Sequence, residues 1–345
     1  MKIKPRARAL LTATALALAG LAATVPGAQA ATRPAATPAT PALHGTRIAL
    51  GATTALFADA FAEAPNGTVF FSRGATVYVV DGNRAPVTAL HAGRTVLALA
   101  ATNADLFVGT GLLVTEYSRA NGRQVRRWTL TSEGTPTSSG LYVVGNTVWA
   151  WTDPATDESG FQYAQVDRMH TSSAAVRVVD TWAFPEDVSA DAAGLYFETA
   201  RGGVTDDLAH ANPTTAAVQY RKAPVDAPLA LANGRVDLLE FGTSAEDVLS
   251  YNATTLALVS SKRVPDADAA IAGTGLGLLV LAEPCTGFSC ASATVARLNV
   301  ATGGTSGALR APDAYQLLNG PAQAVIEATN VHGTHANLFL VRISS

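Results

Sequence analysis

The most constraining feature of this sequence is a repeated pair of short apolar runs joined by a tight turn. Gly140 to Val144 and Thr147 to Trp151 are rich in β-branched and aromatic residues, and only Gly145-Asn146 separates them. Two such runs across a Gly-Asn turn predict a β-hairpin. Comparable turns recur from residue 66 onward, at Asn66-Gly67, Asn103-Ala104, Gly145-Asn146, Ala193-Gly194, Asn233-Gly234, Thr274-Gly275 and Asn319-Gly320.

A second marker recurs out of phase with these turns, where an apolar run ends in a polar hinge before another run. The hinges are expected at Val80-Asp81, Tyr117-Ser118, Val166-Asp167, Ala211-Asn212, Tyr251-Asn252 and Leu298-Asn299. Their spacing of about 37 to 49 residues is typical of units of four strands. Helical repeats of similar length are disfavoured, because the runs have the composition of strands.

The two ends of the repeat complement each other. A seventh hinge is due near Arg342, but the chain stops three residues later, so the last unit lacks a fourth strand. Thr46 to Leu50 is an unassigned strand-like segment, and pairing it with the last unit would cover exposed sheet edges. We therefore expect an all-β fold over residues 46–345: a seven-bladed β-propeller of four-stranded blades, closed by an N-terminal strand. The wide aromatic side chains of four tryptophans are expected to fill the gaps between twisted sheets. These are Trp128, Trp149, Trp151 and Trp182.

The hinge sequences also indicate a family resemblance. Asn252-Ala253-Thr254-Thr255 and Asn299-Val300-Ala301-Thr302-Gly303 each follow an apolar strand and precede an outer one. This pattern resembles the quinoprotein-like and YVTN-type β-propellers of secreted bacterial proteins. The resemblance covers residues 46–345 and implies a fold, and it assigns a role to no residue.

The N-terminus predicts export. Residues 1–30 contain four basic side chains, an apolar run from Ala9 to Val25 and the small-residue cleavage site Ala28-Gln29-Ala30, which together indicate a signal peptide. Ala7 separates Arg6 from Arg8, so the signal is of the Sec type and not the twin-arginine type. A membrane anchor is the alternative. Residues 31–45, rich in Ala, Thr and Pro, are expected to form a disordered leader, and the mature protein is expected to be extracellular.

Charge and hydropathy narrow the choice of partners. Removing the four basic residues of the signal from the 24 Lys and Arg leaves 20 against 27 Asp and Glu, a net charge of −7. This balance disfavours a nucleic-acid partner. The later apolar runs are too short to cross a bilayer. We therefore expect a soluble monomer without membrane attachment after cleavage.

One predicted face gathers carboxylates. Within each blade, the loops between the second and third strands share a face with the blade-to-blade connections, and by fold analogy this is the usual binding surface. Three consecutive blades place acidic residues there, all expected outside the core. These candidate ligand-binding residues are Asp153, Asp157, Glu158, Asp206, Asp207, Glu246 and Asp247. Such a surface would favour a divalent cation or a basic partner, and ordinary solvent-facing loops are the alternative.

Signals for metals and catalysis are weaker. Asp153 to Gly160 could supply oxygen ligands to Ca²⁺ but lacks the EF-hand spacing, and His332 with His335 lacks a third ligand. The segment Gly287 to Ala291 departs from a nucleophile elbow in its last position and has no following helix. Gly273 to Gly277 lacks the strand-then-helix setting of a dinucleotide site. The sequence therefore assigns no catalytic residue and no cofactor other than a possible Ca²⁺.

Two functions from different classes remain open. The favoured one is a non-catalytic binding or protein-interaction module whose acidic loop face meets a protein, a cation or a small molecule. The alternative is a secreted hydrolase or lyase with a loop-built active site on the same face, using carboxylates or His332. In either case Cys285 and Cys290, the only cysteines and five positions apart in an exported chain, are expected to form a disulfide, with free thiols as the alternative.

Overall fold

The computed structural model describes residues 41–53, 60–131, 137–153, 164–170, 175–181, 188–201, 205–223, 227–240, 246–264, 270–274, 277–282, 293–318, 320, 324–332 and 335–345. They belong to one compact unit, Thr40–Ser345. Every regular element in these ranges is a β-strand. None of the described residues forms a helix of the length and hydropathy that crossing a membrane requires.

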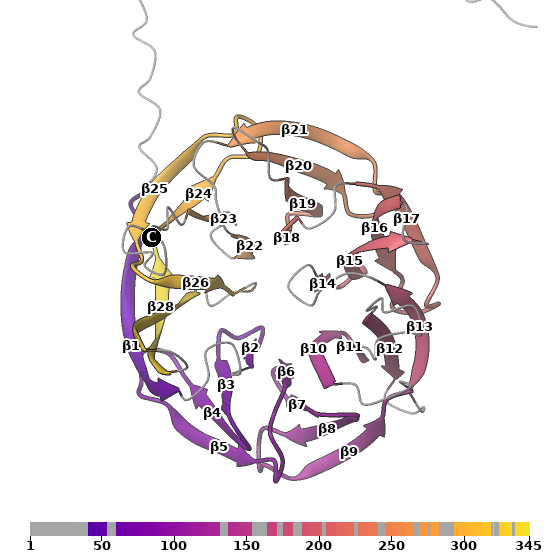
Figure 1. The fold of residues 1–345 in the computed structure, drawn as a ribbon, viewed down its shortest axis with the longest axis vertical. Coiled ribbons are helices and arrows are strands. Elements are labelled where there is room, and N and C mark those ends of the chain that lie inside the picture. The colour runs from indigo at the N-terminus through magenta and orange to yellow at the C-terminus, as the bar shows by residue number, and fades with distance from the viewer. Residues whose placement is uncertain are drawn as a thin grey trace, which may run out of the picture. The chain divides into compact units, whose positions relative to one another are not determined.

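The strands of the described residues form seven four-stranded antiparallel sheets, numbered here 1 to 7 in chain order (Figure 1). Sheet 1 contains β2 (Phe61–Glu63), β3 (Val69–Arg73), β4 (Thr76–Val80) and β5 (Val87–His91). Sheet 2 contains β6 (Ala98–Ala101), β7 (Asp105–Thr110), β8 (Leu113–Ser118) and β9 (Gln124–Thr129). Sheet 3 contains β10 (Thr137–Val144), β11 (Thr147–Asp153), β12 (Ala164–His170) and β13 (Val176–Thr181).

The remaining sheets repeat this order. Sheet 4 contains β14 (Val188–Asp191), β15 (Gly194–Arg201), β16 (Thr205–Ala211) and β17 (Val218–Lys222). Sheet 5 contains β18 (Leu229–Ala232), β19 (Arg235–Glu240), β20 (Glu246–Asn252) and β21 (Leu258–Val264). Sheet 6 contains β22 (Ala270–Thr274), β23 (Gly277–Ala282), β24 (Thr294–Leu298) and β25 (Thr305–Arg310). Sheet 7 contains β26 (Ala314–Leu317), β27 (Ala324–His332), β28 (His335–Ser344) and, from the other end of the chain, β1 (His44–Thr53).

The pairing of β1 with β28 confirms that the N-terminal strand completes the last sheet. The register runs from His44 opposite Ser344 to Thr53 opposite Ala336, with an irregularity between Ala49 and Gly51. The strand is longer than the predicted Thr46 to Leu50, because pairing continues on both sides of that apolar segment. β28 therefore has hydrogen-bonded neighbours on both edges.

Apolar clusters fill the gaps between successive sheets. Of the seven clusters found among the described residues, six join sheets that are consecutive in number, and the seventh joins sheet 7 to sheet 1 through Ile48, Leu340, Val69 and Phe71. Burial of apolar surface therefore links every sheet to two neighbours. Trp128, Trp149 and Trp151 lie in these clusters as expected, whereas Trp182 is outside the described residues.

The polar hinges share one conformation. In the connections that follow β8, β16, β20 and β24, a backbone N–H donates to the carbonyl four residues earlier, and the donor has a positive φ. The donors are Gly122, Ala216, Leu256 and Gly303. Asn212 and Asn252 stabilise their hinges further, because each side-chain oxygen accepts the N–H groups two and three residues ahead.

One predicted hinge is wrong. Val166-Asp167 lies inside β12, and the connection to β13 follows His170. Asp167 is buried, with its carboxylate accepting hydrogen bonds from the N–H and hydroxyl of Thr131, both at 2.6 Å. These donors satisfy a charge that would otherwise be costly in a strand interior, so the strand continues through it.

Candidate functional site

The strand order distinguishes two ends of each sheet, called here the loop face and the turn face. The loop face contains the ends of the second strands and the starts of the third, and the turn face contains the ends of the first strands and the starts of the second. Asp153 is the last residue of β11, Asp206 is the second of β16, and Glu246 and Asp247 are the first two of β20. The backbone thus places these four residues at the loop face of sheets 3, 4 and 5.

Two expectations about these acidic residues are wrong. Asp153, Asp206, Asp207, Glu246 and Asp247 belong to strands and not to loops, because the strands extend further toward the loop face than the apolar runs suggested. Asp207 is moreover only 5% exposed, so it belongs to the interior and not to an open rim. The Asp247 carboxylate lies 4.0 Å from the Arg263 guanidinium, and both side chains are exposed enough for water to weaken this pair.

Several other candidates lie outside the described residues. These are Asp157, Glu158, Cys285, Cys290 and the segment 287–291, so the possible Ca²⁺ loop and the disulfide stay predictions. His332 and His335 occupy opposite positions in the register of β27 and β28. Within the ranges the structure covers, no three His, Cys, Asp or Glu side chains gather as a metal site would require.

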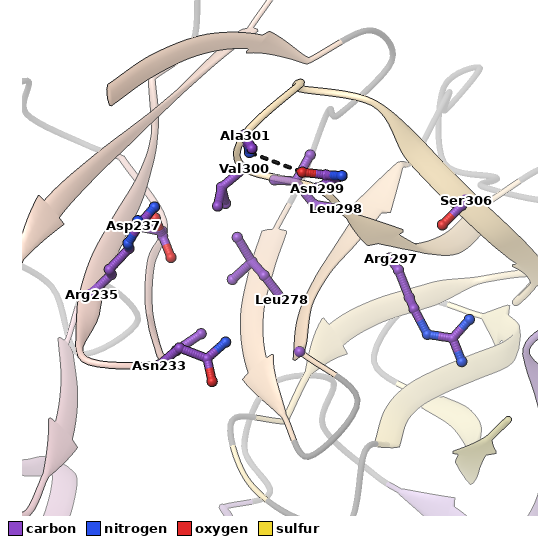
Figure 2. A pocket seen from close by; sticks show the side chains of 12 residues that line it. Asn233, Arg235, Asp237, Leu278, Arg297, Leu298, Asn299, Val300, Ala301 and Ser306 are labelled. Atoms are coloured by element: carbon purple, nitrogen blue, oxygen red, sulfur yellow. Dashed lines mark hydrogen bonds between the residues drawn. The ribbon is translucent and has the colours of Figure 1, made fainter. Parts of the chain in front are cut away.

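A pocket that the sequence did not predict opens on the turn face between sheets 5 and 6. Its volume is about 560 Å³. Asn233, Arg235 and Asp237 of sheet 5 form one wall, and Leu278, Asn299 and Val300 of sheet 6 form the other (Figure 2). Asn233 is in the β18–β19 turn and has a φ of 52°, while Asn299 begins the hinge after β24. Two turn elements of neighbouring sheets therefore frame the opening.

Asp237 is the buried charged group of this pocket. It is 1% exposed, and its carboxylate accepts a hydrogen bond from the hydroxyl of Ser250, its partner on β20. Burial raises the pKa of Asp237 to about 6, against the opposing effects of the Ser250 hydrogen bond and the nearby Arg235. Burial thus brings the pKa of this carboxyl group closer to neutrality than that of an exposed aspartate.

Comparison of the sheets shows why the pocket exists. The third residue of the second strand faces the following sheet and is apolar in sheets 2, 3, 4, 6 and 7, where it is Phe107, Trp149, Tyr196, Leu279 and Ile326. In sheet 5 the same position is Asp237. The smaller carboxylate leaves space between sheets 5 and 6. An alignment of the repeats strand by strand would have identified this exception in the sequence.

Comparisons with known proteins indicate the fold. No protein-family model and no characterised protein sequence matches the chain, so the quinoprotein-like and YVTN-type resemblance stays a prediction. Among solved structures, a chain of a mitotic checkpoint complex matches with a TM-score of 0.55 at 12% identity, covering 94% of this chain and 98% of the other.

Two further structures match over most of their length. The β-propeller domain of Myceliophteria thermophila Cps50 (Swd1) gives a TM-score of 0.50 at 11% identity, covering 81% of this chain and 95% of that domain. The AfRom2 CNH domain gives a TM-score of 0.51 at 10% identity, covering 86% of this chain and 98% of that domain. Identities this low show the fold alone. The four-stranded sheets, the clusters between them and these similarities together show a β-propeller fold.

Proposed function

We propose that this chain is an exported, non-catalytic protein-interaction module. In this proposal the seven sheets are the blades of a closed propeller, and the loop face of sheets 3 to 5 contacts a basic segment of another protein. The matched structures support an interaction role, since one of them is a chain of a multiprotein complex. Export follows from the predicted signal peptide in residues 1–30.

The observation that carries the proposal is the position of acidic residues at strand ends of three consecutive sheets. Asp153, Asp206, Glu246 and Asp247 come from β11, β16 and β20, whose ends share the loop face. Strand ends are held by ladder hydrogen bonds, so these residues are presented from a rigid frame. Like charges in a row attract a basic partner and accelerate its encounter.

The test compares two variants of equal charge. The loop-face variant replaces Asp153, Asp206 and Glu246 by Asn, Asn and Gln, and leaves the buried Asp207 unchanged. The turn-face control replaces Asp81, Asp105 and Asp191 by Asn. Capture of each protein on an immobilised lysine-rich peptide is measured at low salt and at about 0.15 M salt, where surface charges are screened beyond roughly 8 Å.

We expect salt-sensitive capture of the unmodified protein, retained by the turn-face control and lost by the loop-face variant. Because both variants lose three negative charges, a difference between them reports position and not net charge. Equal losses in the two variants, or no salt-sensitive capture of the unmodified protein, would contradict the proposed surface.

A further inference from the structure

The pocket between sheets 5 and 6 combines groups of opposite charge with an apolar wall. Arg235 and Asp237 are two residues apart on β19, so they project from the same side of the strand, and the positive charge of Arg235 acts on Asp237. In Figure 2 the Arg235 side chain extends toward Asp237, while Leu278 and Val300 face them across the opening. The second arginine of the lining, Arg297, is engaged elsewhere, since its Nη1 donates to the Pro41 carbonyl at 2.5 Å.

Charged side chains are uncommon at core positions, because burying a charge costs free energy. Five other sheets fill this site with an aromatic or aliphatic side chain, which excludes water and contributes to packing. Asp237 both removes that packing and introduces a carboxylate whose burial is costly. Ser250 supplies one hydrogen bond, and a carboxylate can accept several. The arrangement therefore suits an occupant that brings its own donors.

We propose that this pocket binds a small zwitterion with an apolar side chain, of the size of an amino acid or dipeptide. The ammonium group of the ligand pairs with the Asp237 carboxylate, and its carboxylate pairs with the Arg235 guanidinium. The apolar side chain packs against Leu278 and Val300. A volume of about 560 Å³ lies within the usual range for small-molecule sites.

This site is separate from the proposed interaction surface. The pocket opens on the turn face of sheets 5 and 6, whereas the acidic strand ends lie on the loop face of sheets 3 to 5. Binding of the zwitterion therefore neither requires nor excludes the protein partner, and the two proposals fail independently.

The test uses the dipeptide Leu-Leu as the probe, with binding measured by titration calorimetry at pH 7.5. The N-acetylated dipeptide lacks the ammonium group, and the C-terminal amide lacks the carboxylate. We expect the free dipeptide to bind, and each blocked form to bind at least tenfold more weakly, because each loses one of the two charge pairs. Equal binding of all three forms, or no binding of the free dipeptide, overturns the proposal.

Two variants locate the site. Asp237→Phe installs the type of residue found in the other sheets, so it should fill the pocket, abolish dipeptide binding and raise the melting temperature. Asp237→Asn keeps the size of the side chain and should weaken binding at least tenfold, which keeps the test decisive if the Phe variant does not fold. Asp105→Asn, at the start of β7 on the same face, is the control and should bind normally. Unchanged affinity in the Asp237→Asn variant contradicts the assignment.

Discussion

Buried carboxylates connect neighbouring sheets at two places among the described residues. Asp167 of sheet 3 accepts two hydrogen bonds from Thr131, which follows sheet 2. Glu198 of sheet 4 accepts one from the N–H of Ala227, 3.0 Å away at the start of sheet 5. Hydrogen bonds to a charged acceptor are stronger than neutral ones, and removing their donors leaves a buried charge. The hydrogen bonds of these two side chains therefore hold each sheet against its neighbour.

Glu63 is the clearest titratable group at the junction of sheets 1 and 7. Burial raises its pKa to about 8, opposed by the positive charge of Arg342. Arg342 itself donates to the carbonyls of Gly67 at 3.0 Å and Val80 at 3.3 Å. Gly320 approaches so closely that a Cβ there would lie 2.5 Å from Glu63 Oε2. The Glu63 carboxyl group is therefore closely packed against the backbone of Gly320 and lies near the charge of Arg342.

This crowding predicts a pH-dependent stability. The folded-state pKa of Glu63 is above the unfolded value of 4.5. The contribution of protonated Glu63 to the free energy of unfolding is therefore fully present below pH 4.5 and is lost as the pH rises to about 8. Glu63→Gln resembles the protonated form, so it should match the unmodified protein near pH 4.5 and be more stable by about 4.5 kcal/mol at pH 8.5. Urea denaturation of both proteins across this range measures the difference. Parallel pH profiles would show that Glu63 ionises freely in the folded state.

Burial of acidic residues was the point at which prediction from sequence failed. The sequence predicted a hinge at Asp167 and a loop at Asp207. Both residues instead lie within strands and are buried. The donors that satisfy Asp167 come from Thr131, thirty-six residues earlier. A contact of that separation leaves no trace in the local pattern, so the sequence predicted a hinge at Asp167 instead of a continuing strand.

At the scale of elements, the turns were predictable because their chemistry is local. Asn233-Gly234 and Gly145-Asn146 join the strands that flank them in the sequence. The hinges after β16 and β20 follow from the asparagines that cap them. The pocket was not predictable from such signals. It exists because position 237 holds an aspartate where other sheets have an apolar residue, and because this position faces sheet 6.

The shared hinge conformation predicts a stabilising substitution. Ala216 has a φ of 60° at the position where two other hinges have Gly122 and Gly303. A Cβ is strained in this region and glycine is not. Ala216→Gly should therefore raise the free energy of unfolding by about 1 kcal/mol, measured by urea denaturation.

The neighbouring alanine provides the matched control. Ala217 is exposed and is not among the described residues with positive φ, so Ala217→Gly should lower the free energy of unfolding by about 0.5 kcal/mol through greater freedom of the unfolded chain. Effects of the same sign at both positions would mean that backbone strain does not control the hinge.

At the scale of the whole propeller unit, strands from the two ends of the described residues, β1 and β28, share one sheet. β1 covers one edge of β28, and Ile48 and Leu50 belong to the cluster between sheets 7 and 1. The sequence predicted this pairing because a strand was missing from the last unit and a spare strand-like segment lay near the N-terminus. The proposed interaction surface combines residues from sheets 3, 4 and 5, which a repeat pattern alone does not bring together.

We propose that β1 closes the ring of sheets, and the melting temperatures of two shortened chains test this closure. A chain that begins at residue 41 keeps β1, whereas one that begins at residue 54 exposes the edge of β28 and removes Ile48 and Leu50 from their cluster. We predict that the first melts at the temperature of the mature protein and that the second melts at least about 10 °C lower, since losing several kcal/mol shifts the midpoint by this amount. Equal melting temperatures for the two chains would contradict a ring closed by its N-terminal strand.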